Sequence, residues 1–93
     1  MKDFHRCPSF TDVKETIYGY ARSDTRITKP ARNRHAIQLA KRIMQNGREW
    51  AFHCYRALCA YQPSTIEQAT RFISHFERHH PRDFFEGEAF LIV

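Results

Sequence analysis

The sequence is poor in glycine and contains no long apolar run. Its 93 residues include only three glycines, so a glycine-rich loop of the kind that cradles phosphate groups is excluded. No apolar stretch approaches the roughly 18 residues that span a bilayer, and we expect no membrane-embedded segment. The N-terminal residues lack the apolar core of a secretory signal, and the cysteine count of three is odd. Together these absences predict a cytoplasmic protein with reduced thiols.

Groups suited to catalysis are also scarce. His53 and Cys54 are neighbours in sequence, so on a helix their side chains diverge and cannot act as a nucleophile and its base. Paired carboxylates are few, and small helical domains seldom enclose a pocket of the size that substrates need. We therefore expect a protein that is not an enzyme and uses no cofactor.

The chain does contain enough apolar and aromatic residues for one core. Hydrophobic residues make up 42% of the sequence and eight are phenylalanine, so aromatic rings should fill much of the interior. A chain of this length forms a single domain. We predict one all-α domain over residues 1–93, a small bundle of about four helices. It should include a lead-in at 1–9, a basic loop at 23–29 and a short apolar C-terminal tail at 83–93.

Capping residues and helical periodicity place the first two helices. The first should begin near Thr11, with Thr11 itself or Ser9 as its N-cap. Pro30 fits the first position of the second helix, which should run to Asn46. We expect Gly47 to end this helix as a left-handed cap.

The last two helices follow from the same reasoning. Residues 48–61 are apolar around most of a helical circumference, which is typical of a helix at the centre of a domain. Ser64 and Glu67 then predict a capping box, with Ser64 as the N-cap. The helix that this box opens should run to His80, because Pro81 cannot continue it.

Positive charge is concentrated between residues 22 and 48. This segment holds eight basic residues and one acid, a net charge of +7, whereas the whole chain carries +5. Charge segregated to this degree attracts an anionic partner before any contact forms. We expect that partner to be nucleic acid, or a protein complex that handles nucleic acid.

The second helix offers a defined binding surface. Arg34, Gln38, Lys41 and Gln45, which we call the polar stripe, lie opposite its apolar side. Arginine and glutamine side chains recognise the edges of nucleobases through two hydrogen bonds. The basic residues around them would contact phosphates. The predicted binding residues are the polar stripe together with Arg22, Arg26, Lys29, Arg32, Arg42 and Arg48.

The same charge also fits a second class of function. A protein-binding adaptor or inhibitor could dock its basic side on an acidic patch, or on the nucleic-acid channel of a partner enzyme. In size and composition the chain resembles small accessory proteins of phages and plasmids, which implies this kind of role. A standard helix-turn-helix does not fit, because it would bury Arg42, Asn46 and Arg48.

A further alternative is a zinc-finger-like module. The spacing of Cys54, Cys59, His75 and His79 lies within the loose pattern of a site with two cysteines and two histidines. Such a module requires residues 50–61 to form a β-hairpin, yet their polar positions keep a helical period. On a helix the two cysteines would lie about 140° and about 7.5 Å apart and could not share an ion. We expect no metal, and these four residues remain the ligand set if the segment is a hairpin.

Overall fold

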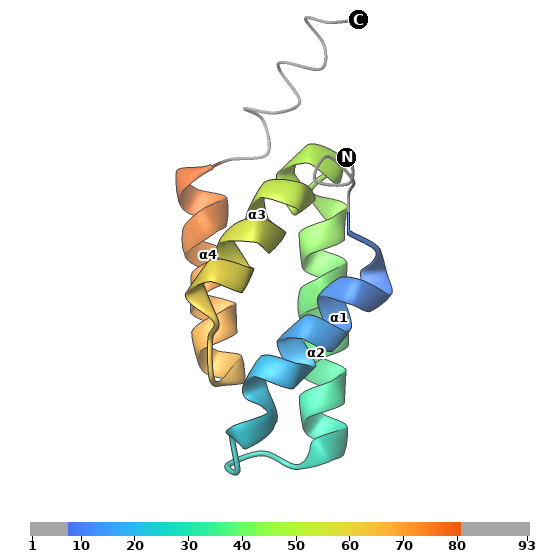
Figure 1. The fold of residues 1–93 in the computed structure, drawn as a ribbon, viewed down its shortest axis with the longest axis vertical. Helices are drawn as coiled ribbons and strands as arrows, with labels where there is room; N and C mark the ends of the chain where they lie inside the picture. Colours follow the sequence, from blue (N-terminus) through green and yellow to red (C-terminus); the bar gives the residue numbers. More distant parts are fainter. Residues whose placement is uncertain (1–7, 81–93) are drawn as a thin grey trace, which may run out of the picture.

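The computed structural model describes residues 8–80, and these form a bundle of four α-helices with no strand (Figure 1). The predicted all-α class is thereby confirmed. Residues 1–7 of the lead-in and the apolar tail at 83–93 lie outside the described residues. In chain order the elements are α1 (Phe10–Tyr20), a 3-10 turn η2 (Ala21–Ser23), α2 (Lys29–Gln45), α3 (Arg48–Tyr61) and α4 (Ile66–His79).

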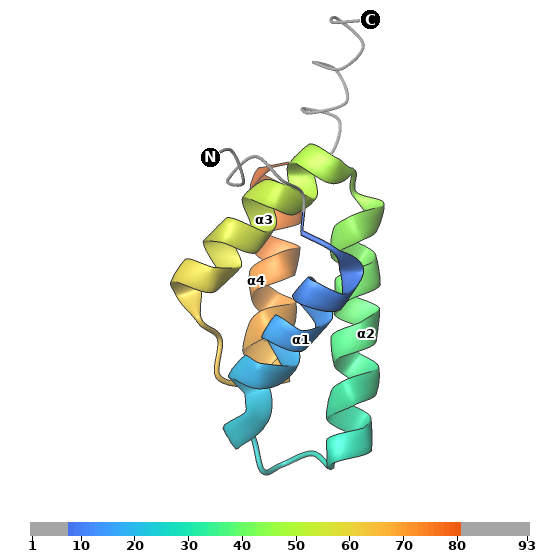
Figure 2. The same cartoon turned by 45° about the vertical axis from the view of Figure 1, so that its right-hand side comes forward.

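α2 is the helix against which the other three pack. It contacts α1, α3 and α4, and its inner side is fully buried at Ala36, Ala40 and Ile43. The two alanines let neighbouring helices approach closely, since they add little volume beyond the backbone. Figure 2 shows α2 along one edge of the bundle, so its opposite side faces outward. One helix therefore supplies both the centre of the core and an outer surface.

α3 does not lie at the centre of the domain, and that prediction is wrong. Trp50, Cys54 and Leu58 are fully buried, but Tyr61 at the end of the helix is 51% exposed. The Trp50 ring meets the ring of Phe76 edge to face, with centroids 5.2 Å apart, where α3 contacts α4. The apolar circumference of α3 thus includes rings that pack at its margins and remain partly in contact with solvent.

Side-chain caps begin three of the four helices. Ser9 caps α1, where its hydroxyl accepts a hydrogen bond from the Asp12 N–H at 3.0 Å and the Asp12 carboxylate accepts from the Ser9 N–H at 3.3 Å. Thr28 caps α2, and Pro30 stands in the first turn. These contacts satisfy backbone donors that have no partner inside the helix.

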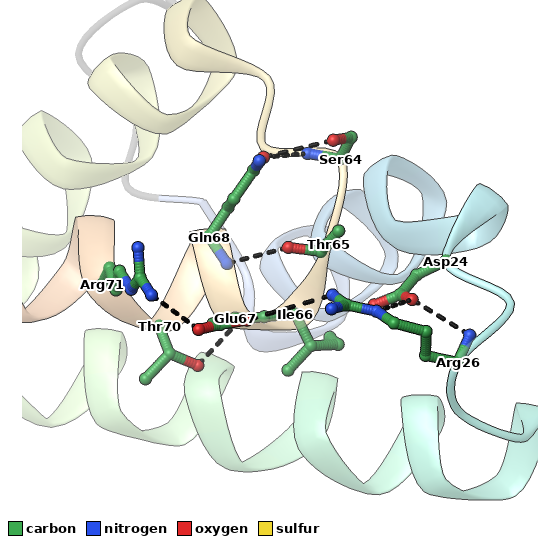
Figure 3. A network of polar contacts seen from close by, with 9 residues as sticks. All are labelled: Asp24, Arg26, Ser64, Thr65, Ile66, Glu67, Gln68, Thr70 and Arg71. Atoms are coloured by element: carbon green, nitrogen blue, oxygen red, sulfur yellow. Dashed lines mark hydrogen bonds and ion pairs between the residues drawn. The ribbon is translucent and has the colours of Figure 1, made fainter.

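The N-cap of α4 lies one residue later than predicted. Thr65, not Ser64, is the N-cap, and its hydroxyl accepts from the Gln68 N–H at 3.0 Å. The Gln68 side chain accepts from the Ser64 N–H at 2.9 Å (Figure 3). The predicted capping box between Ser64 and Glu67 is therefore wrong, and the Glu67 carboxylate is available for ion pairs.

The connection between α2 and α3 also differs from the prediction. α2 ends at Gln45 with Asn46 as its C-cap. Gly47 has a φ of 105° and a ψ of 157°, so its φ is the positive kind that glycine adopts readily, but its ψ lies outside the left-handed helical region. It serves as the N-cap of α3, which begins at the next residue. The left-handed cap occurs instead at Gln62, where α3 ends with φ 55° and ψ 65°.

Candidate nucleic-acid interface

The polar stripe is exposed along the outer side of α2. Its four residues all lie on the surface, and the buried residues of the helix lie on the opposite side. Three helical turns, about 16 Å of length, separate Arg34 from Gln45. This exposure agrees with the sequence-based expectation.

The two cations of the polar stripe keep their charge unpaired within the described part of the chain. No salt bridge there joins Arg34 or Lys41 to a carboxylate, and α2 contains no acidic residue. Arg22, Lys29 and Arg48 are likewise exposed and take part in no ion pair among residues 8–80. We call these five bases the exposed bases, and their charge is available to an external partner.

Arg32 is buried, so it does not belong to the predicted surface. It is 5% exposed, and its Nη2 donates to the main-chain oxygen of Asp24 at 2.9 Å. Its guanidinium carbon lies 5.4 Å from the centroid of the Tyr18 ring, whereas its Nε has no hydrogen-bond partner among the described residues. The sequence carried a signal for this placement, since Arg32 precedes Ala36 by one turn and falls on the apolar side of α2.

Arg42 is directed to α4 rather than to solvent, and it too leaves the predicted surface. Its guanidinium donates to both carboxylate oxygens of Glu77, at 2.7 and 3.2 Å, and to the Ser74 hydroxyl at 2.9 Å. The Asn46 side chain also donates to Glu77, at 3.2 Å. Burial opposes ionisation of Glu77, but the hydrogen bonds from Arg42 and Asn46 keep its pKa below the usual range. Arg42 therefore clamps α2 to α4.

Arg26 lies at the surface but is engaged within the chain. Its Nε donates to the Asp24 carboxylate at 3.2 Å, and its Nη2 lies 3.9 Å from Glu67, which in turn accepts from Arg71 at 2.6 Å (Figure 3). The hydrogen bond from Arg26 holds the pKa of Asp24 below its usual range. These contacts tie the loop at 24–28 to the start of α4.

The four residues of the zinc alternative are not brought together. Cys54 and Cys59 both lie on α3, in place of the required hairpin, and burial raises the pKa of the Cys54 thiol to about 12. His75 and His79 are exposed on α4. Within residues 8–80, no group of three or more His, Cys, Asp or Glu side chains is placed to hold a metal ion. The zinc finger is therefore not the fold of this segment.

Comparisons with known proteins add no functional information. No protein-family model matches the sequence, and no curated protein or solved structure matches the chain. Among the described residues, no helix has the length and apolar character needed to cross a membrane.

Proposed function

We propose that this protein binds nucleic acid through the outer side of α2, and that it acts by binding rather than by catalysis. The observation that supports this most strongly is the unpaired charge of the exposed bases. A solvated helix surface usually carries both signs of charge, whereas α2 carries no acid at all. Phosphate groups are the commonest partners of such a surface.

The shape of the surface also supports the proposal. α2 lies along an edge of the bundle (Figure 2), and an α-helix about 10–12 Å wide fits the major groove of duplex DNA, which is about 12 Å wide. Lys29 at the start of α2 and Arg48 just beyond its end flank the polar stripe. In this arrangement the flanking lysine and arginine contact phosphates, and Arg34 and Gln38 lie nearest to the edges of the nucleobases.

The test is fluorescence anisotropy of labelled duplex DNA, single-stranded DNA and RNA, titrated with the protein at several salt concentrations. Engagement of all five exposed bases on duplex DNA gives a slope of log K against log salt of roughly −4 to −5. Arg34→Glu combined with Lys41→Glu should weaken binding roughly 100-fold at about 0.1 M salt, because two phosphate contacts are lost and two repulsions gained.

A matched control variant has the same net charge as the stripe variant, but its substitutions lie on other helices. Arg56 and Arg78 are exposed on α3 and α4, and reversing both to Glu lowers the formal net charge by four, from +5 to +1, as the stripe variant does. The control should retain most of the affinity. Equal losses in both variants would show that only total charge matters and would contradict a binding site on α2. If the native protein binds none of the three nucleic acids at low salt, the basic side is a docking surface for an acidic protein.

A further inference from the structure

His75 and His79 form a pair on the outer side of α4 that the proposed nucleic-acid site does not use. Both are exposed, and their ring centroids lie 4.1 Å apart with the ring planes inclined by 39°. We infer that this pair binds one divalent transition-metal ion of the class that imidazole prefers, Ni²⁺, Cu²⁺ or Zn²⁺.

The spacing of the two rings suits a shared ion. Residues four apart on a helix are neighbours on its surface, so their side chains can converge on one point. Imidazole nitrogens bind these ions at about 2.0–2.1 Å, which places the centres of two ligating rings roughly 4.5–5 Å apart. The observed pair therefore needs to open by less than about 1 Å, a change that side-chain rotation supplies.

The turns of α4 that carry the pair are held in place from the inner side. Ile73 is fully buried and Phe76 nearly so, and the Trp50 indole N–H donates to the main-chain oxygen of His80 at the end of the helix. The two rings therefore project from a fixed stretch of backbone, which lowers the conformational entropy lost when both ligate one ion.

The local charge is compatible with a bound cation. Two arginines lie within one turn of His75 on α4. Arg71 is paired with Glu67 at 2.6 Å, which offsets its charge. Arg78 has no ion pair among residues 8–80, but it is exposed, so solvent and salt screen its charge. A general role at the helix end, in which histidine stabilises the C-terminal dipole, does not require two rings at this spacing.

The pair makes an open chelate rather than a closed structural site. No third protein ligand accompanies it among residues 8–80, so water completes the coordination. For such nitrogen ligands the affinity order places Cu²⁺ above both Ni²⁺ and Zn²⁺. The histidine pair lies on α4 and the polar stripe on α2, so the outcome of a metal-binding test is independent of nucleic-acid binding.

The test is titration of the full-length, untagged, reduced protein with NiCl₂ by isothermal calorimetry. The native protein should bind one ion per chain. His75→Ala or His79→Ala should each weaken that binding at least tenfold, since even the loss of a residue that only hydrogen-bonds a metal ligand typically lowers the metal affinity about 10–100-fold. His35→Ala removes a single exposed histidine on α2 and should leave the affinity unchanged. Alanine favours helix more than histidine does, so the variants should stay folded, as circular dichroism can verify.

A second measurement identifies the ligands directly. Addition of ZnCl₂ should shift the imidazole NMR resonances of His75 and His79 and leave that of His35 in place. The inference is overturned if the native protein shows no saturable binding, if either alanine variant binds as well as the native protein, or if one ion is held per two chains.

Discussion

Basic residues on the two sides of α2 have different surroundings. Arg32 and Arg42 turn inward, where one is buried against Tyr18 and the other is bonded to Glu77. Arg34 and Lys41 turn outward and have no ion pair within residues 8–80. A charge count taken from sequence therefore overstates the charge that a partner meets. Of the eight basic residues between positions 22 and 48, Arg26, Arg32 and Arg42 are engaged within the chain, and the other five are exposed with no ion pair among residues 8–80.

The largest loss of stability should come from the buried member of the inward pair. Arg32→Ala removes the packed stem and leaves the Asp24 main-chain oxygen without its donor, so we expect a loss of about 2–4 kcal/mol in the free energy of unfolding. Arg32→Met keeps the unbranched stem and removes the Nε that lacks a partner. In urea denaturation, the free energy of unfolding of Arg32→Met should fall by less than half as much as that of Arg32→Ala. Equal losses in the two variants would mean that the charge, not the packing, stabilises this site.

A smaller loss should follow from opening the clamp between α2 and α4. Glu77→Gln leaves Arg42 without its carboxylate, and because both side chains are about one-third exposed we expect a loss of about 1–2 kcal/mol. Thermal and urea denaturation measure this directly. Nucleic-acid affinity should be retained, because the change lies on the inner side of α2. Loss of affinity in a variant that remains folded would contradict the division of α2 into two sides.

Mild acid should weaken the ion pair of Glu77 with Arg42 and that of Asp24 with Arg26. Asp24 and Glu77 both have a lowered pKa in the folded protein, so they bind protons less readily than in the unfolded chain. Their contribution to stability is present above their ordinary values, 4.5 for Glu77 and 3.8 for Asp24, and is lost as the pH falls through the lower folded values. The melting temperature should therefore begin to fall below about pH 4.5. In Glu77→Gln this fall should be smaller at the upper end of the acid range, because the Glu77 carboxylate is absent. An unchanged profile in Glu77→Gln would contradict the lowered pKa of Glu77.

The difference between the inward arginines shows what the sequence can and cannot predict. The four helices and the polar stripe follow from periodicity within single segments, and the position of Arg32 one turn before Ala36 carried the same information. The bond between Arg42 and Glu77 joins residues 35 positions apart on different helices. It depends on how α4 docks against α2, which no local pattern contains.

Errors at the helix ends have a different origin. Ser64 with Glu67, and Thr65 with Gln68, both satisfy the same capping template, so the sequence offers two registers and the structure uses the second. Gly47 is a good residue for a left-handed cap, but α3 begins immediately after it, and Gly47 serves as the N-cap of α3 with φ 105° and ψ 157°. In both cases the sequence allows two capping arrangements at neighbouring positions, and the structure uses only one of them.

The smallest effect on stability should come from the outward residues taken singly. Arg34→Ala and Lys41→Ala should each change the free energy of unfolding by no more than about 0.5 kcal/mol, because neither side chain bonds within the described chain. Each should nevertheless reduce the salt slope of duplex DNA binding by about one, since each removes one phosphate contact. Arg78→Ala on α4 serves as the control and should leave the slope unchanged. If Arg34→Ala lowers stability as much as Glu77→Gln does, the outer side of α2 stabilises the fold, and its charge is not free for a partner.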